Sequence, residues 1–137
     1  MDPADRDGLE FLRALLAQRT DLALVVLFGS TARGCARPDS DLDVAVVPLG
    51  AWSAVDEAAF VDALERATGR DVDLLRLDRV DDVVLRREVA RGVPLREHTP
   101  FAFARFAAEA ALEWLDFEPV YLGAQARYLR GVAQRAR

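Results

Sequence analysis

Lysine is absent from this chain, because all 18 of its basic residues are arginine. Genomic base composition is the simplest source of that bias, but it still has a chemical consequence. Without lysine, neither a Schiff-base nucleophile nor the lysine of a P-loop can take part in catalysis. A phosphate group that the protein binds must therefore take its cationic side-chain contacts from arginine, beside backbone N–H groups.

Cysteine and long apolar runs are also scarce. Cys35 is the single cysteine, so no disulfide can form within the chain, which fits a reducing compartment. The first five residues are acidic rather than basic, unlike the start of a secretory signal peptide. No apolar run approaches the roughly 18 residues that a membrane-spanning helix needs. We therefore expect a soluble, cytoplasmic protein that does not enter a membrane.

The chain also has no excess of basic residues, because 23 acidic residues outnumber the 18 arginines and give a formal net charge of −5. Nucleic-acid-binding domains rely on basic surface, so we expect no direct nucleic-acid binding. The arginines at the C-terminal end are compatible with RNA or an acidic partner, and equally with a solvated helix face; they are Arg127, Arg130, Arg135 and Arg137.

The hydrophobic pattern predicts an α/β layer fold with a helical extension. With 137 residues, we expect one domain, made of a core over residues 1–98 and a C-terminal helical extension over 99–137. Pro119 is expected to break the extension into two helices. Strands are expected at 22–28, 41–47 and 71–77, with a short edge strand at 93–95. Helices are expected from Asp2-Pro3 to about 19, and at 31–33, 53–67, 81–91, 101–115 and 120–135.

The turn after the first expected strand has the composition of a phosphate-binding turn. Gly29 lets the backbone approach a ligand closely, because it has no side chain. Ser30 stands where a helix N-cap would stand, and its hydroxyl can donate to a phosphate oxygen beside backbone N–H groups that favour an anion. Arg33 adds a permanent charge and a forked donor for a triphosphate. Alone, these residues are also compatible with a plain strand-to-helix turn.

Two carboxylates follow at the start of the next expected strand. Asp41 and Asp43 are two positions apart and therefore share one face of the strand, while Leu42 and Val44 point into the core. Carboxylates so close repel each other unless they are solvated, protonated or bound to a metal. Their oxygen atoms suit Mg²⁺ or Mn²⁺ held together with substrate phosphates. Alone, the pair is also compatible with a solvated strand edge.

A third acid is expected on the following strand, because a two-metal phosphoryl transfer usually uses a third carboxylate. Asp71 and Asp73 share one face there, and Asp73 is the deeper of the two. It is expected to act as a metal ligand or as the base that activates the attacking hydroxyl. The reaction that follows is a two-metal, in-line attack on the α-phosphate of a nucleoside triphosphate, which releases pyrophosphate. Its expected catalytic and metal-binding residues are Asp41, Asp43 and Asp73, and its nucleotide-binding residues are Gly29, Ser30 and Arg33.

These motifs resemble the minimal nucleotidyltransferases of the DNA polymerase β superfamily. That family's pattern is Gly-Ser, ten residues, then Asp-x-Asp, and Gly29-Ser30 with Asp41-Leu42-Asp43 meets it without departure. Asp73 matches the family's third acid, and residues 85–95 look like the helix and short strand that usually follow. The resemblance covers about residues 8–122. It implies a nucleotidyltransferase-like mixed sheet of three to four strands, flanked by helices.

Leu115-Asp116-Phe117 looks like the helical end of the MntA-type antitoxins of that superfamily. This subfamily implies an antitoxin that transfers AMP from ATP to a tyrosine of a partner HEPN-domain ribonuclease toxin, with Mg²⁺ or Mn²⁺ as cofactor. The short extension fits, because larger nucleotidyltransferases carry a substantial extra domain.

Two alternatives stay open. One is a binding-only antitoxin that blocks the toxin sterically, and the other is an enzyme that modifies a small molecule such as an aminoglycoside. Trp114, Phe117 and Tyr121 are either core residues or an aromatic anchor at the toxin interface.

Overall fold

The computed structural model describes residues 6–34 and 40–136, which form a four-stranded mixed sheet flanked by helices. The predicted α/β fold is confirmed. The sheet order is β3-β2-β1-β4, in which β1 is antiparallel to both of its neighbours and β2 is parallel to β3. The strands are β1 (Leu22–Phe28), β2 (Leu42–Pro48), β3 (Val72–Arg76) and β4 (Val93–Glu97).

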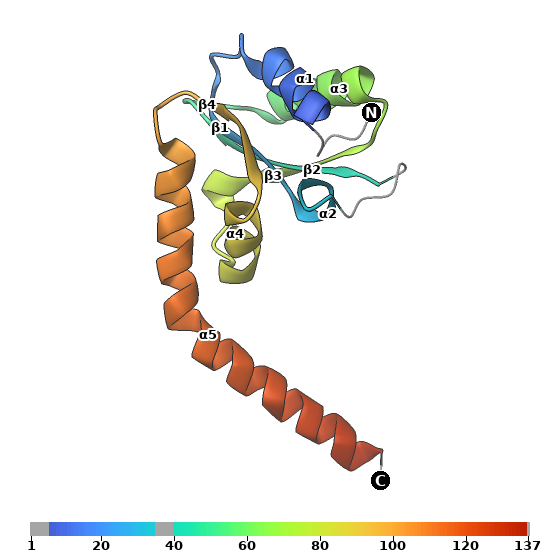
Figure 1. Cartoon of the computed structure of the whole chain (residues 1–137), viewed down its shortest axis with the longest axis vertical. Coiled ribbons are helices and arrows are strands. Elements are labelled where there is room, and N and C mark those ends of the chain that lie inside the picture. Colours follow the sequence, from blue (N-terminus) through green and yellow to red (C-terminus); the bar gives the residue numbers. More distant parts are fainter. Residues whose placement is uncertain (1–5, 35–39, 137) are drawn as a thin grey trace.

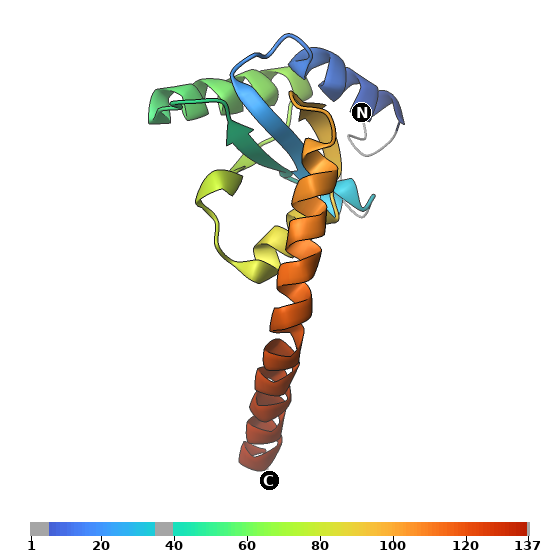
Figure 2. The ribbon, with the colours of Figure 1, turned by 90° about the vertical axis from the view of Figure 1, so that its left-hand side faces the viewer.

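Helices cover both faces of this sheet (Figures 1 and 2). On one face lie α1 (Arg6–Leu16) and α3 (Ala54–Thr68), and on the other lie α4 (Val83–Ala90) and the first part of α5 (Ala102–Arg135). The short helix α2 (Gly29–Ala32) joins β1 to the segment before β2, and a 3₁₀ turn, η1 (Leu77–Arg79), follows β3. No helix within the described ranges is both long enough and apolar enough to cross a membrane.

Alternate side chains of the central strands β1 and β2 point to opposite faces of the sheet and belong to two separate hydrophobic cores. Leu27 and Val44 belong to the cluster under α1 and α3, whereas Val26 and Ala45 belong to the cluster under α4 and α5. Because β1 is buried on both faces, its sequence is a continuous apolar run instead of an alternating one. The short β4 pairs only with β1, so its Pro94 stands on an edge strand, as predicted.

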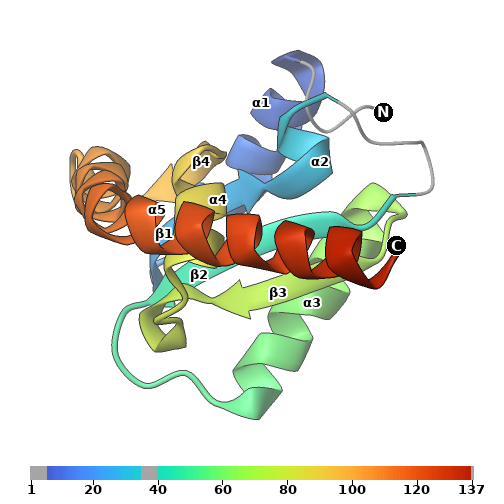
Figure 3. The ribbon, with the colours of Figure 1, turned by 90° about the horizontal axis from the view of Figure 1, so that it is seen from below.

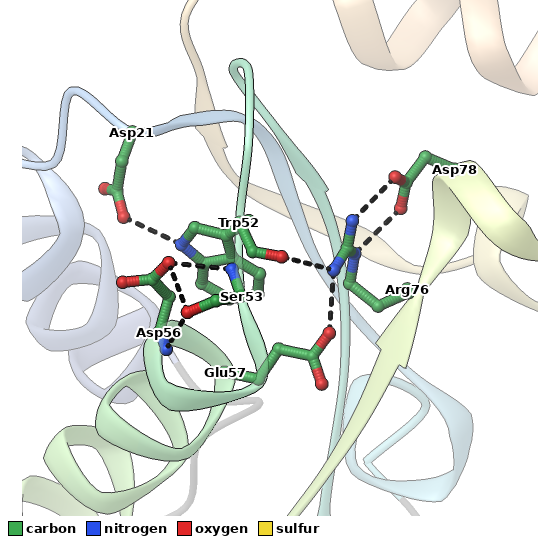
Figure 4. Close-up of polar contacts among 7 residues, drawn as sticks. All are labelled: Asp21, Trp52, Ser53, Asp56, Glu57, Arg76 and Asp78. Atoms are coloured by element: carbon green, nitrogen blue, oxygen red, sulfur yellow. Dashed lines mark hydrogen bonds and ion pairs between the residues drawn. The ribbon is translucent and has the colours of Figure 1, made fainter.

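The connection from β2 to α3 is fixed by two sets of polar contacts, drawn in Figure 4. Ser53 and Asp56 form the capping box that their spacing predicts, with Asp56 Oδ2 accepting from the Ser53 N–H at 2.7 Å. These hydrogen bonds from Ser53 lower the pKa of Asp56. The Trp52 indole donates to Asp21 Oδ2 at 3.1 Å.

Arg76, at the end of β3, makes the second set. Its guanidinium donates to both carboxylate oxygens of Asp78, to Glu57 Oε1 at 2.7 Å and to the Trp52 carbonyl. The same group lies over the Trp52 ring, 5.5 Å from the centroid. These contacts join α3, β3 and η1 at the end of β3 away from Asp73.

The expected break at Pro119 is wrong, because α5 is one continuous helix of 34 residues. Pro119 has no N–H to donate to the Leu115 carbonyl, and its ring crowds that carbonyl. The flanking residues favour a helix enough for it to continue, and Figure 1 shows that it bends midway instead of ending. Every residue from Pro119 to Arg130 is exposed.

The other boundaries differ by a few residues from those predicted. Helix α1 ends at Leu16, three residues earlier than expected, and the helix predicted at 31–33 begins at Gly29. The expected cap at Asp2-Pro3, the cysteine Cys35 and most of the loop predicted at 34–39 lie outside the described residues.

Candidate active site

Asp43 occupies the centre of the candidate site because it stands on an interior strand. It pairs with Phe28 of β1 on one side and with Asp73 of β3 on the other. Leu42 and Val44 are fully buried on the opposite face, as the alternation predicts. Asp43 is therefore half-buried, at the end of the sheet where α2 begins.

Asp73 and Asp41 flank Asp43 in more open positions. Asp73 lies on the outermost strand and Asp41 immediately before β2, and both side chains are exposed. Asp43 and Asp73 come two residues before Ala45 and Leu75, which pack into the α4 and α5 core. Both carboxylates therefore belong to the sheet face that α4 and α5 cover.

The three acids influence one another electrostatically. Burial raises the pKa of Asp43 above its ordinary value, and the negative charges of Asp73 and then Asp41 raise it further. The cluster thus concentrates negative charge that a bound cation would relieve.

Gly29 covers the Asp43 carboxylate. Its φ of 72° is in the left-handed region, and a Cβ atom added there would overlap Asp43 Oδ2. Glycine is needed at this position both for the backbone turn and for the space above the carboxylate. As a result, α2 starts directly over Asp43, and Ser30 is held beside it, partly exposed.

Thr31 is a positioning residue that the sequence interpretation missed. It is the one buried polar side chain of the described residues, fully inaccessible, and its hydroxyl donates to the Asp41 carbonyl at 3.2 Å. Arg70 donates to the Ser40 carbonyl at 3.3 Å from the other side. The chain entering β2 is thus held on both sides. The sequence does not reveal this role of Thr31, because its hydrogen-bond partner, Asp41, is ten residues away along the chain.

Arg33 is placed less directly than the sequence suggested. It follows the last residue of α2, its side chain is half-exposed, and its Nη1 lies 3.7 Å from Glu88 Oε2 of α4. That contact joins α2 to α4. A role of Arg33 in holding phosphate stays a prediction.

The donor set suits a divalent cation, although the described residues contain no preassembled group of three or more His, Cys, Asp or Glu side chains that would hold one. Carboxylate oxygens are the ligands that Mg²⁺ prefers, and it usually binds through one or two carboxylates together with substrate phosphates. Burial, and then the charges of Asp73 and Asp41, raise the pKa of Asp43 and so disfavour its ionised form, which a bound cation would favour. Asp41, Asp43 and Asp73 are therefore the residues that would hold such an ion.

Comparisons with known proteins agree with this geometry. The family model described as polymerase beta, nucleotidyltransferase matches residues 10–99. A comparison with curated proteins finds no match. Among solved structures, a toxin–antitoxin with AMP-PNP is 24% identical with a TM-score of 0.62, and the match covers 95% of this chain and 99% of that chain.

Two further solved structures resemble the chain. One is a tri-AMPylated Shewanella oneidensis HEPN toxin in complex with an MNT antitoxin, at 22% identity and a TM-score of 0.55, covering 94% of this chain and 99% of that chain. The other is a proposed minimal nucleotidyltransferase, at 34% identity and a TM-score of 0.51, covering 64% and 88%. The family match spans all four strands, α2 and the three carboxylates. The chain belongs to the polymerase β nucleotidyltransferase family.

Proposed function

We propose that the protein is an antitoxin that transfers AMP from ATP to a tyrosine hydroxyl of a partner HEPN-domain toxin. The observation that carries the proposal is the pairing of Asp43 with Asp73 beneath Gly29 of the Gly-Ser turn. Three carboxylates beside the Gly-Ser turn support a metal-assisted reaction of a phosphate substrate bound at that turn. Solved structures of similar fold include a toxin–antitoxin with AMP-PNP and a tri-AMPylated HEPN toxin with its antitoxin, which supports the choice of nucleotide and acceptor.

The residues have separate roles in this reaction. Asp41 and Asp43 would hold Mg²⁺ together with the phosphates of ATP, and Ser30 and Arg33 would bind the β- and γ-phosphates. When bound, the metal would supply charge neutralisation for the attacking oxygen and for the pyrophosphate. Asp73 stands on the edge strand with an exposed side chain, so a hydroxyl presented by another protein can reach it.

The chemistry is an in-line displacement. The tyrosine oxygen forms a bond to the α-phosphorus while the bond from that phosphorus to the pyrophosphate oxygen breaks. The tyrosine proton passes to Asp73, and pyrophosphate leaves with the bonding electron pair. AMP remains on the toxin through a phosphodiester to the tyrosine.

A labelled-ATP assay tests the proposal. The chain is incubated with Mg²⁺, ATP labelled in its α-phosphate and the protein encoded in the neighbouring reading frame. We expect label on that protein with the wild type and none with Asp41→Asn combined with Asp43→Asn, while circular dichroism confirms that the variant is folded.

Two results would contradict the proposal. If the double variant neutralises the toxin as fully as the wild type, the antitoxin acts by binding alone. If label appears on an aminoglycoside and not on the protein, the acceptor is a small molecule.

A further inference from the structure

The distal part of α5, residues 120–135, projects from the domain with an apolar stripe along one side. We call it the α5 arm. Figures 1 and 3 show the arm running out beneath the sheet face that carries Asp43, beyond α4, without packing on another element of the described chain. Isolated helices of this length are marginal in water, so the arm needs a partner to be stable.

The stripe continues the side of α5 that packs on α4. Trp114, Phe117 and Tyr121 stack successively with ring centroids 5.6 to 6.0 Å apart, and the Arg87 guanidinium lies 4.2 Å from the Trp114 centroid. Tyr128 and Val132 follow seven and four residues later, 66% and 41% exposed. Spacings of three, four and seven residues keep all of these side chains on one side of a helix.

A cavity lies at the root of this stripe, between α4 and α5. It measures about 370 Å³ and is walled by alanines, Trp114 and Leu115, with Arg87 and Arg91 at its rim. Arg91 is exposed and has no ion pair within the described residues. An apolar recess with cationic edges suits an apolar side chain that acidic residues flank.

Charge argues against two α5 arms packing on each other. All 23 acidic residues precede Pro119, and the residues after it carry four arginines and no acid. Two arms packed together would place arginine against arginine, which is unfavourable. A partner helix with an apolar face and acidic flanks matches both the stripe and its charges.

The position of the arm relates the partner to the candidate active site. Helix α4 forms one wall of the cavity through Arg87, and its Glu88 contacts Arg33 beside the Gly-Ser turn. A protein that occupies the cavity therefore contacts α4, the helix that also contacts Arg33 beside the Gly-Ser turn. We propose that the α5 arm and the cavity between α4 and α5 dock an acidic, helical face of the protein that accepts AMP. This inference rests on the proposed function.

The test compares full-length Tyr128→Glu with Leu112→Glu. The two parent side chains are equally exposed, at 66% and 65%, but lie on nearly opposite sides of α5. Binding to the HEPN-domain protein of the neighbouring frame is measured in the background of Asp41→Asn with Asp43→Asn, so that no transfer alters the complex. Transfer of labelled AMP is measured separately in the wild-type background.

We expect Tyr128→Glu to weaken binding about tenfold or more, as loss of an interface anchor does, and Leu112→Glu to leave it unchanged. Transfer by Tyr128→Glu should fall at low acceptor concentration and recover at high concentration. If the wild type binds the acceptor but labels nothing, the proposed function fails while the docking surface stands.

Several results would overturn the docking proposal. If Tyr128→Glu bound the acceptor and transferred AMP as well as the wild type, the docking proposal would be wrong and the proposed function would stand. If Tyr128→Glu and Leu112→Glu lost binding equally, the docking proposal would also be wrong. Concentration-dependent dimerisation of the chain alone, abolished by Tyr128→Glu, would make a second copy the occupant. Loss of labelled RNA binding in Tyr128→Glu, with acceptor binding unchanged, would identify the arm as an RNA contact.

Discussion

Gly29 lies directly over the carboxylate of Asp43, so close that a methyl group on the glycine would overlap the carboxylate oxygen Oδ2. The turn that is expected to hold the triphosphate and the acid that is expected to hold the metal are therefore in contact. The space between them is too small for any side chain at position 29.

Replacing Gly29 by alanine should lower the rate of transfer strongly. Its left-handed backbone costs an alanine about 1 kcal/mol, and the new methyl group must also push Asp43 aside. A displacement of this kind lowers activity by about a hundredfold or more. Gly50→Ala is the matched control, because Gly50 has a similar φ of 76° and open space around it. It should lose similar stability in thermal unfolding and keep its activity. Equal activity in the two variants would disprove the contact's importance.

Thr31→Val should lower transfer without removing any group that contacts substrate. Valine keeps the shape of threonine but leaves the Asp41 carbonyl without the hydroxyl that donates to it at 3.2 Å. We expect a stability loss of about 1 kcal/mol. A fall of about tenfold in kcat is expected from the loosened start of β2.

Thr31→Ser restores the hydroxyl and provides the control. It should recover most of the rate although it removes a buried methyl group. A serine variant as slow as the valine variant would assign the effect to packing alone.

Asp43→Asn should change how stability depends on pH. The folded-state pKa of Asp43 is raised, so the folded protein holds a proton that the unfolded chain loses near the ordinary carboxyl value of 3.8. Stability therefore falls as pH rises from that value through the raised pKa, and it stays lower above it. Asparagine cannot ionise, so the variant does not lose stability in this pH range.

Melting temperatures with and without Mg²⁺ measure the effect. In EDTA the variant should melt at or above the wild-type temperature at neutral pH. Mg²⁺ should raise the melting temperature of the wild type more than that of the variant, because binding to the folded state stabilises it. A wild type that Mg²⁺ leaves unchanged would contradict the assignment of Asp43 as a ligand.

Asp78 should change the pH dependence of stability in the opposite sense to Asp43, because its pKa is lowered and not raised. Its two hydrogen bonds from Arg76 lower its pKa, so it stabilises the fold at pH values above the ordinary carboxyl range. That contribution is lost as pH falls through the lowered pKa. Urea unfolding between pH 3 and about pH 6 should show a shallower loss of stability in Asp78→Asn than in the wild type. If the stability of the wild type and of the variant changed with pH in parallel, the Arg76–Asp78 ion pair would contribute nothing to the pH dependence of stability.

Local patterns in the sequence were sufficient for much of the core. Gly29-Ser30 and Asp41-Leu42-Asp43 are short motifs, and strand alternation alone places Asp43 opposite the buried Leu42 and Val44. The capping box of Ser53 and Asp56 spans four residues and is equally local. Such features depend on neighbours along the chain, which a sequence displays directly.

Features that depend on distant partners were harder to predict. The hydrogen bond from Thr31 to Asp41 exists only after α2 folds back on β2, and the contact of Arg33 with Glu88 requires α4 to pack nearby. The predicted break at Pro119 was wrong because proline disfavours a helix locally, whereas the surrounding residues favour one and keep α5 continuous. The metal-binding and phosphate-binding roles of the site residues stay predictions.

The register between β2 and β3 makes the proposed chemistry sensitive to chain length. Asp43 and Asp73 are neighbours because the two strands pair residue for residue, from Leu42 with Val72 to Val46 with Arg76. A slip of one position would turn Asp73 to the opposite face, toward α3. An insertion that shifts β3 by one residue would therefore separate the acids and also turn Val72, Leu74 and Leu75 away from the cores they pack against, so that both activity and stability would fall.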